Sequence, residues 1–331
     1  MKAYLIRRLL LIVPALIGIS AISFLAVQLA PGSPIYMVLL SGRGNGNEGA
    51  DTQKIIEDTK RLYGLDKPVP VQYALWLGRL AHLDFGNSYK DQRPVREKIL
   101  EALPVTLELN VLSILLIYLI SIPIGVYSAV HRGNKIDNAL TVLLFLLYSL
   151  PSFFAAMLLM LLFCGGEYFN WFPAFGLHSL EADSWSWGRY LLDHFWHLVL
   201  PVLCLTYGGL AGMSRYARAG MIETIRQDYV RTALAYGFPE RTVIYKYAMR
   251  NSLIPIITLA GTLLPALIGG SIIIEQIFSI PGMGRLTFQA ILARDYPVVM
   301  GTLTFSALLT LLGLVLTDVL YAMVDPRIKY E

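Results

Sequence analysis

Two carboxylic acids lie in or beside long apolar runs of the sequence. Asp318 falls in LTDVLYAMVDP, about one to two helical turns before its run ends, and Glu275 lies at the end of another run. A carboxylate inside a membrane span can carry a proton or a cation, so both residues are functional candidates. For Asp318 we favour a structural hydrogen bond or ion pair near the membrane surface. For Glu275 two alternatives stay open, a place on a transport pathway and simple contact with water.

Two further patterns could bind ligands. His194 and His197 form H-x-x-H, but a metal site needs further ligands at helical spacing and none is evident, so packing near the membrane surface is favoured. Gly44, Gly46 and Gly49 fit G-x-G-x-x-G. A dinucleotide site requires a strand before this motif and a helix after it, whereas an apolar span precedes it here. Neither pattern therefore predicts a bound metal or cofactor.

No catalytic motif occurs in the chain. The sequence lacks G-x-x-x-x-G-K-[ST], H-E-x-x-H and G-x-S-x-G. We therefore predict no catalytic, cofactor-binding or metal-binding residue and no enzymatic activity of the chain itself. If ATP drives this protein, another chain must bind ATP and Mg.

The composition is that of a membrane protein. The chain has 331 residues, of which 56% are hydrophobic and 15% are charged. Cys164 and Cys204 both fall in apolar runs and are expected to be inert thiols rather than a disulfide. An all-α membrane protein is the predicted fold class.

Apolar runs of about membrane-spanning length predict six transmembrane helices. They cover residues 9–30, 105–130, 138–163, 196–214, 252–275 and 297–323, and Pro151 interrupts the third. The first run is too long for a signal peptide and is predicted to be retained. Residues 31–104 form a polar, mixed segment, 164–195 an aromatic-rich loop with an interfacial helix, and 278–299 a loop with a short helix.

The basic residues predict the orientation. With the N-terminus inside, the inner segments hold 14 Lys and Arg and the two short outer loops hold 3. The positive-inside rule therefore places both termini in the cytoplasm.

The basic stretch 231–255 separates two apolar runs and is predicted to form a helix, a tight turn and a second helix. One apolar face comprises Val230, Ala233, Leu234, Gly237 and Phe238, and the next comprises Val243, Ile244, Tyr247 and Ala248. Gly237 suits the left-handed position that ends a helix, and Pro239 suits the first turn of the next. Such a helix pair can pass mechanical work from a soluble partner to the membrane. The alternative is an amphipathic loop that only lies on the membrane surface; binding to nucleic acid is disfavoured because the bilayer holds the segment.

The segment Tyr229 to Gly237, YVRTALAYG, resembles the "EAA" loop of ABC-importer permeases in its dipeptide, oligopeptide and nickel branch, where YVRTA-x-A-x-G is common. With Gly237 as anchor, the triplet falls on Arg231, Thr232 and Ala233, and only Ala233 matches. Asp228 is the candidate substitute for the missing Glu. The segments GLDKPVPVQY, DFGNSY, FSIPGMGRL, DYP and DPR extend the resemblance over nearly the whole chain.

The resemblance implies a type I ABC importer permease fold. Residues 1–102 would form the first transmembrane helix and the external segment, and residues 103–325 the permease core, with a cytoplasmic coupling loop at about 219–251. The residues implied to contact the ATPase are Asp228, Arg231, Thr232, Ala233, Ala235, Gly237, Phe238 and Pro239.

The resemblance also implies the partners and the substrate. The partners are a homologous permease subunit (a heterodimer is favoured over a second copy), two ABC ATPase subunits that hold ATP and Mg, an extracytoplasmic substrate-binding protein and membrane lipid. Di- or oligopeptides are the expected substrates, and nickel chelates, glutathione and oligosaccharides stay open. The expected location is the bacterial inner membrane. The alternative is a stand-alone secondary transporter or channel, which would call for mid-membrane carboxylates and an internal repeat.

Overall fold

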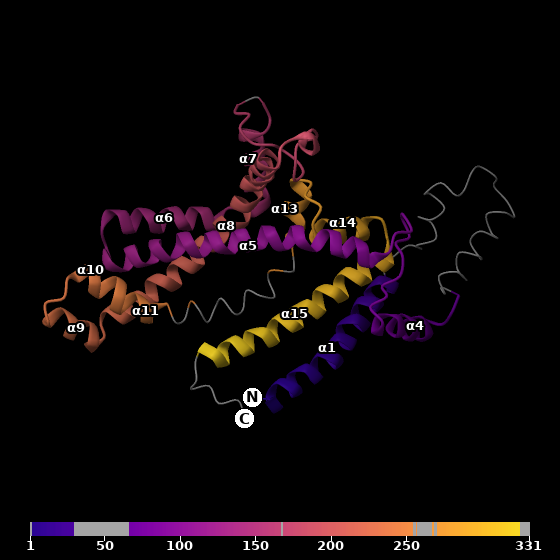
Figure 1. Cartoon of the computed structure of the whole chain (residues 1–331), viewed down its shortest axis with the longest axis horizontal. Helices are drawn as coiled ribbons and strands as arrows, with labels where there is room; N and C mark the ends of the chain where they lie inside the picture. Colours follow the sequence, from indigo (N-terminus) through magenta and orange to yellow (C-terminus); the bar gives the residue numbers. More distant parts are fainter. Residues whose placement is uncertain are drawn as a thin grey trace. The chain divides into compact units, whose positions relative to one another are not determined.

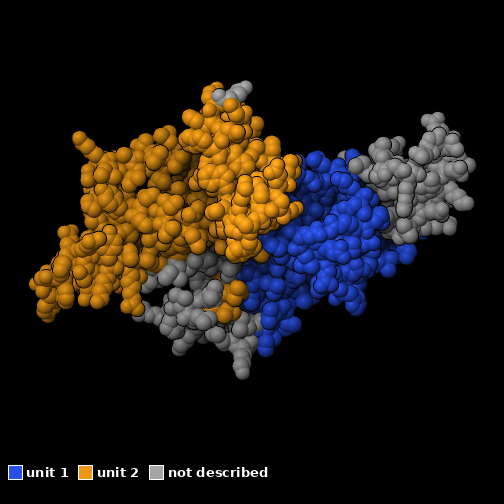
Figure 2. All heavy atoms as spheres, turned by 45° about the horizontal axis from the view of Figure 1, so that its top comes forward, with its two compact units in different colours: residues 1–105, 281–315, 330–331 blue, residues 106–280, 316–329 orange. Residues whose placement is uncertain are grey.

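The computed structural model describes residues 2–29, 66–166, 168–253, 256, 267 and 270–324. The chain divides into two compact units (Figure 2). Unit 1 comprises residues 1–105, 281–315 and 330–331, and unit 2 comprises residues 106–280 and 316–329. Two of the boundaries, after residues 105 and 315, fall inside long helices, so each of these helices contributes one part to each unit.

Helices make up the secondary structure of the described ranges, in which no strand occurs (Figure 1). Unit 1 contains α1 (Lys2–Leu29), α4 (Val69–Ala81), the start of α5 (Val95–Val130), α14 (Met283–Leu292) and most of α15 (Tyr296–Val324). Unit 2 contains the rest of α5 together with α6 (Lys135–Ser149), α7 (Ser152–Phe163), η2 (Ala182–Ser184), α8 (Trp187–Ile225), α9 (Asp228–Ala235), α10 (Glu240–Thr242), η3 (Val243–Ala248), α11 (Met249–Ser252) and α13 (Ile272–Ile277). The predicted all-α membrane class is confirmed.

Four of these helices are long and apolar enough to cross a membrane: Ile6–Leu29 within α1, α5, α8 and Tyr296–Val319 within α15. They correspond to the first, second, fourth and sixth predicted spans. The α6–α7 pair is a fifth candidate. The predicted fifth span, 252–275, lies largely outside the described residues, and the whole of 31–64 with its glycine pattern lies outside them.

The predicted third span is not one straight helix. The chain bends by 97° between α6 and α7. Pro151 caps α7 with a ψ of 138°, and Leu150 before it is also extended, with a ψ of 123°. Proline has no N–H to donate and disfavours helical backbone at the preceding residue, so the helix ends here.

The helices α5 and α8 are longer than their predicted spans. At 1.5 Å per residue their 36 and 39 residues extend about 54 and 58 Å, against about 30 Å of hydrocarbon. Hydropathy missed the first turns of α5 because they carry Glu97, Lys98 and Glu101. The predicted interfacial helix and the fourth span are both parts of α8.

In unit 1, two of the family-like segments meet. The buried Asp295 of DYP accepts a hydrogen bond from the Tyr89 amide of DFGNSY at 2.9 Å and another from the Ser88 hydroxyl. Behind this contact Phe85, Val95 and Val298 are part of the unit's hydrophobic core. The loop that precedes α5 is thereby fixed to the start of α15.

Candidate functional site

The short helix α9 ends as its sequence predicts. Gly237 has a φ of +78°, and its amide donates to the Leu234 carbonyl at 2.9 Å. The Phe238 amide donates to the Ala233 carbonyl at 3.3 Å. These two bonds form a Schellman motif, in which the left-handed residue is usually glycine because a Cβ is unfavourable there.

The second helix of the pair is a single helical stretch with an unexpected turn. The segments α10, η3 and α11 follow one another from Glu240 to Ser252 with helical backbone at each junction, and η3 is a π-helix. Pro239 precedes α10 as its N-cap. A π-turn brings residues five apart onto one face. Val243 and Ala248 are accordingly the residues it buries.

The helix pair is packed onto the ends of α5 and α8. Val230 and Ala233 are buried in a cluster that also contains Val126 and Ala129 of α5 and Met221 of α8. The apolar face predicted over 230–238 is buried only in part, because Leu234 and Phe238 are 47% and 46% exposed. Only a narrow stripe of this two-turn helix contacts the long helices beneath it.

A close backbone approach completes this attachment. A Cβ built on Gly220 in α8 would lie 2.8 Å from the Ser252 carbonyl oxygen in α11. Only glycine permits this distance without a shift of α11.

Three exposed side chains surround the turn, namely Leu234, Tyr236 and Phe238, and we call them the turn rim. Tyr236 is 81% exposed. Figure 1 shows α9 and α10 at one end of unit 2, beyond the C-terminal ends of α5 and α8. The residues predicted from the sequence to contact an ATPase include Phe238 but not Leu234 or Tyr236. The signal in the sequence that could have identified these two residues is an apolar or aromatic side chain next to the buried stripe of the helix.

The polar residues predicted for the site are solvated. Arg231 and Asp228 lie 4.0 Å apart, with side chains 70% and 100% exposed, so this ion pair contributes little to stability. The Thr232 hydroxyl donates to the Asp228 carbonyl at 2.8 Å, and Ala235 is the last residue of α9. These four residues are exposed, and none belongs to the buried cluster that attaches α9 to α5 and α8.

The two candidate carboxylates have different surroundings. Glu275, in α13, is 1% exposed, and its Oε1 accepts a hydrogen bond from the Thr106 hydroxyl at 3.0 Å. Of the two alternatives left open for Glu275, this burial argues against simple contact with water, and a place on a transport pathway stays a prediction. Asp318 is half-buried in α15.

The H-x-x-H histidines join a polar cluster. His194 contacts Glu108 through Nε2 at 2.8 Å and His178 through Nδ1 at 3.2 Å, while Nδ1 of His197 is 2.8 Å from the Asp193 carbonyl. Burial, together with the neighbouring His194, lowers the pKa of His178. Among the described residues no group of three or more His, Cys, Asp or Glu is placed to hold a metal ion.

The chain matches known protein families along most of its length. Residues 121–330 match "Binding-protein-dependent transport system inner membrane component". Residues 1–110 match the N-terminal region of "Binding-prot-dependent transport system membrane comp".

Several curated proteins are similar over full length. The oligopeptide transport system permease protein AppB of Bacillus subtilis (strain 168) is 40% identical, with all of both chains covered. The inner membrane ABC transporter permease protein YejB of Escherichia coli O157:H7 is 36% identical, also over all of both chains. The peptidoglycan transport system permease protein YejB of Agrobacterium fabrum (strain C58 / ATCC 33970) is 35% identical over 100% of this chain and 99% of that protein.

Proposed function

The chain belongs to the family of binding-protein-dependent transport system inner membrane components, and we propose that it is the permease subunit through which an ABC importer moves peptides across the bacterial cytoplasmic membrane. The oligopeptide name of the Bacillus relative supports peptides as the substrate class. A pathway for peptides of many sequences must be wide and make few fixed contacts. An extracytoplasmic binding protein therefore does most of the substrate selection.

The turn rim is the observation that carries the coupling role. Leu234, Tyr236 and Phe238 are exposed, whereas Val230 and Ala233 of α9 are packed against α5 and α8. Exposed apolar and aromatic side chains on a rigid support are typical of the centre of a protein interface. We assign an ATPase subunit as the partner because the chain has no P-loop of its own.

The proposed topology has six spans with both termini in the cytoplasm and an external segment between the first two spans. The four long apolar helices and the α6–α7 pair account for five of these crossings, and the apolar run 252–275 of the sequence supplies the sixth. The excess of basic residues in the inner segments supports the orientation. The turn rim then faces the cytoplasm, where ATPase subunits would be.

The proposed assembly contains this chain, a homologous permease subunit, two ATPase subunits and the binding protein. The ATPase subunits hold ATP and Mg, and this chain holds neither. Closure of the ATPase dimer around ATP moves the helix pair, and the spans change from inward-open to outward-open. ATP shifts this equilibrium only through its different affinity for the two states.

The first experiment isolates the tagged chain gently from native membranes and identifies its partners by mass spectrometry. We expect a P-loop ATPase and a sister permease, with a stoichiometry that distinguishes a heterodimer from a pair of identical chains. The variant Tyr236→Ser should no longer co-purify with the ATPase subunits but should still co-purify with the sister permease. The matched control Tyr168→Ser, at an exposed tyrosine between α7 and η2, should keep both. Equal ATPase recovery with both variants would refute docking through the turn rim.

A stand-alone transporter or channel is the alternative. Asp318 is the one candidate for ion coupling in the last span. Uptake by the purified chain reconstituted without ATP or other subunits would favour this alternative and make Asp318 the residue to study.

A further inference from the structure

Unit 2 contains a pocket that the coupling role does not use. The pocket measures about 230 Å³ and lies among α5, α6 and α8. Its lining combines apolar, hydroxyl and basic side chains, which are Ile124, Ser128, Thr141, Leu144, Phe145, Tyr148, Arg215 and Arg218 among others. This volume is below the roughly 300–1,000 Å³ of sites that enclose drug-sized ligands, so the pocket suits a small headgroup.

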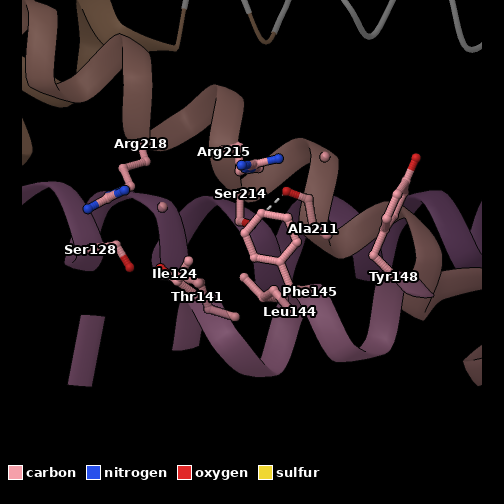
Figure 3. Close-up of a pocket in the computed structure, with 12 residues that line it drawn as sticks. Ile124, Ser128, Thr141, Leu144, Phe145, Tyr148, Ala211, Ser214, Arg215 and Arg218 are labelled. Carbon is pink, nitrogen blue, oxygen red and sulfur yellow. Dashed lines mark hydrogen bonds between the residues drawn. The ribbon is translucent and has the colours of Figure 1, made fainter. Parts of the chain in front are cut away.

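The pocket carries one positive charge in excess. Arg218 forms a 2.7 Å ion pair with Asp137, whose side chain is 1% exposed. Arg215 makes a different contact, because its guanidinium lies over the Phe145 ring, 4.4 Å from the ring centre. Figure 3 shows both arginines projecting from α8 along the same edge of the pocket, with the Phe145 ring beneath Arg215. The guanidinium of Arg215 can therefore bind an anion without breaking the Asp137 pair.

The surroundings of the pocket suit an amphiphile. The side chains of Val142, Leu143 and Leu146 on α6 are exposed and apolar. The pocket lining includes Ser128 near the end of α5 and Thr141 on α6; the loop between these helices carries Arg132, and Lys135 begins α6. The proposed topology places this loop inside, where basic pockets between transmembrane helices bind anionic headgroups.

We propose that this pocket binds the phosphodiester headgroup of an anionic phospholipid, with the phosphate at Arg215 and the acyl chains along the apolar side chains of α6. The basic residue supplies the charge complementarity, and the exposed apolar residues supply a surface that lipid tails can cover. A bound lipid would connect α5, α6 and α8 at the end that supports the helix pair.

The test uses the complete transporter complex, purified in detergent and mixed with dioleoylphosphatidylglycerol or dioleoylphosphatidylcholine. Native mass spectrometry measures the lipid retained by this chain. We expect selective retention of phosphatidylglycerol by the wild type and about fivefold less with Arg215→Gln, the effect of removing one arginine near an anionic lipid. Arg215→Lys, which keeps the positive charge, should retain most of the phosphatidylglycerol that the wild type retains.

The matched control is Arg189→Gln. Arg189 also lies on α8 and also stacks on an aromatic ring, that of Trp185 at 3.8 Å, but it lies at the opposite end of the helix. Retention should be unchanged in this variant. Equal loss in both variants, or no loss with Arg215→Gln, would overturn the proposal. Thermal unfolding of the same complex separates a lipid from a free anion. If inorganic phosphate alone stabilised the complex as much as phosphatidylglycerol does, the pocket would be assigned to a free anion and the proposal would be overturned. None of these measurements requires transport activity.

Discussion

Gly220 of α8 lies directly against the backbone of Ser252 in α11, where a Cβ on the glycine would come within 2.8 Å of the serine carbonyl oxygen. This approach joins the end of the helix pair to the longest helix of unit 2. Together with the buried contacts of Val230 and Ala233, it fixes the pair to α8. A displacement of the pair would therefore also displace α8, which contains the fourth predicted span.

Gly220→Ala should loosen this connection. The added methyl group must displace the Ser252 backbone, because a carbonyl oxygen cannot approach a carbon atom so closely. We expect ATP-driven uptake to fall severalfold while the chain remains in the membrane. The matched control is Gly208→Ala on the same helix, where a Cβ would meet nothing within 4 Å. Unchanged uptake by Gly220→Ala would show that the close contact is not needed for coupling.

The sequence predicted the helices whose hydrophobicity is nearly continuous. The first, second, fourth and sixth spans were found because apolar runs of this length have few alternatives to a membrane helix. The ends of α5 and α8 were missed because hydropathy detects the lipid-facing part of a helix and not its polar extensions. The 97° bend at Pro151 depends on where α7 packs, and a single proline does not determine that angle.

At the candidate site, local chemistry was predictable and burial was not. Gly237 at φ +78° follows from glycine's tolerance of left-handed backbone. The exposure of Leu234 and Phe238 depends on how α9 packs against α8 and against α5, and α5 is distant in sequence. The pairing of Asp137 with Arg218 was missed for the same reason, since 81 residues separate them.

Substitutions at Gly237 should separate backbone strain from partner contact. No atom lies within 4 Å of a Cβ built there, so the cost comes from the left-handed backbone, about 1–2 kcal/mol for a residue other than glycine. Gly237→Asn should retain ATPase binding and most uptake, because asparagine tolerates this conformation. Gly237→Arg should abolish uptake and leave the chain in the membrane, because it adds a long cation beside the turn rim. Normal uptake by Gly237→Arg would exclude this turn as the docking surface.

Removing the charge of Asp295 should destabilise unit 1. Asn can accept only one of the two hydrogen bonds that Ser88 and the Tyr89 amide donate to the buried carboxylate. We expect a loss of about 1–3 kcal/mol, the cost of a buried polar group left without its partner. This loss of stability should appear as faster proteolysis of the 82–94 segment in the Asp295→Asn variant than in the wild type. The control Asp84→Asn alters a carboxylate whose hydrogen bond to the Gly86 amide is exposed, and it should have a smaller effect.

Acidification should destabilise the segment that contains His178. The groups that face its ring are His194, Asp193, Tyr190, His197 and Asp183. Burial and the nearby histidines lower the pKa of His178, so the unfolded segment takes up its proton first as the pH falls. The stability that neutral His178 contributes is therefore complete above its ordinary pKa of about 6.5 and is lost as the pH falls below that value.

Amide hydrogen exchange between pH 7.5 and pH 5.5 measures this loss, after correction for the intrinsic pH dependence of exchange. We expect protection of residues 177–197 to decrease toward the lower pH in the wild type. His178→Asn should reduce the decrease, because asparagine does not titrate. His82→Gln, at the exposed end of α4, is the control and should keep the wild-type response. If His178→Asn also kept it, the response would have to arise from the other groups of the cluster, with His194 and Glu108 as the next pair to vary.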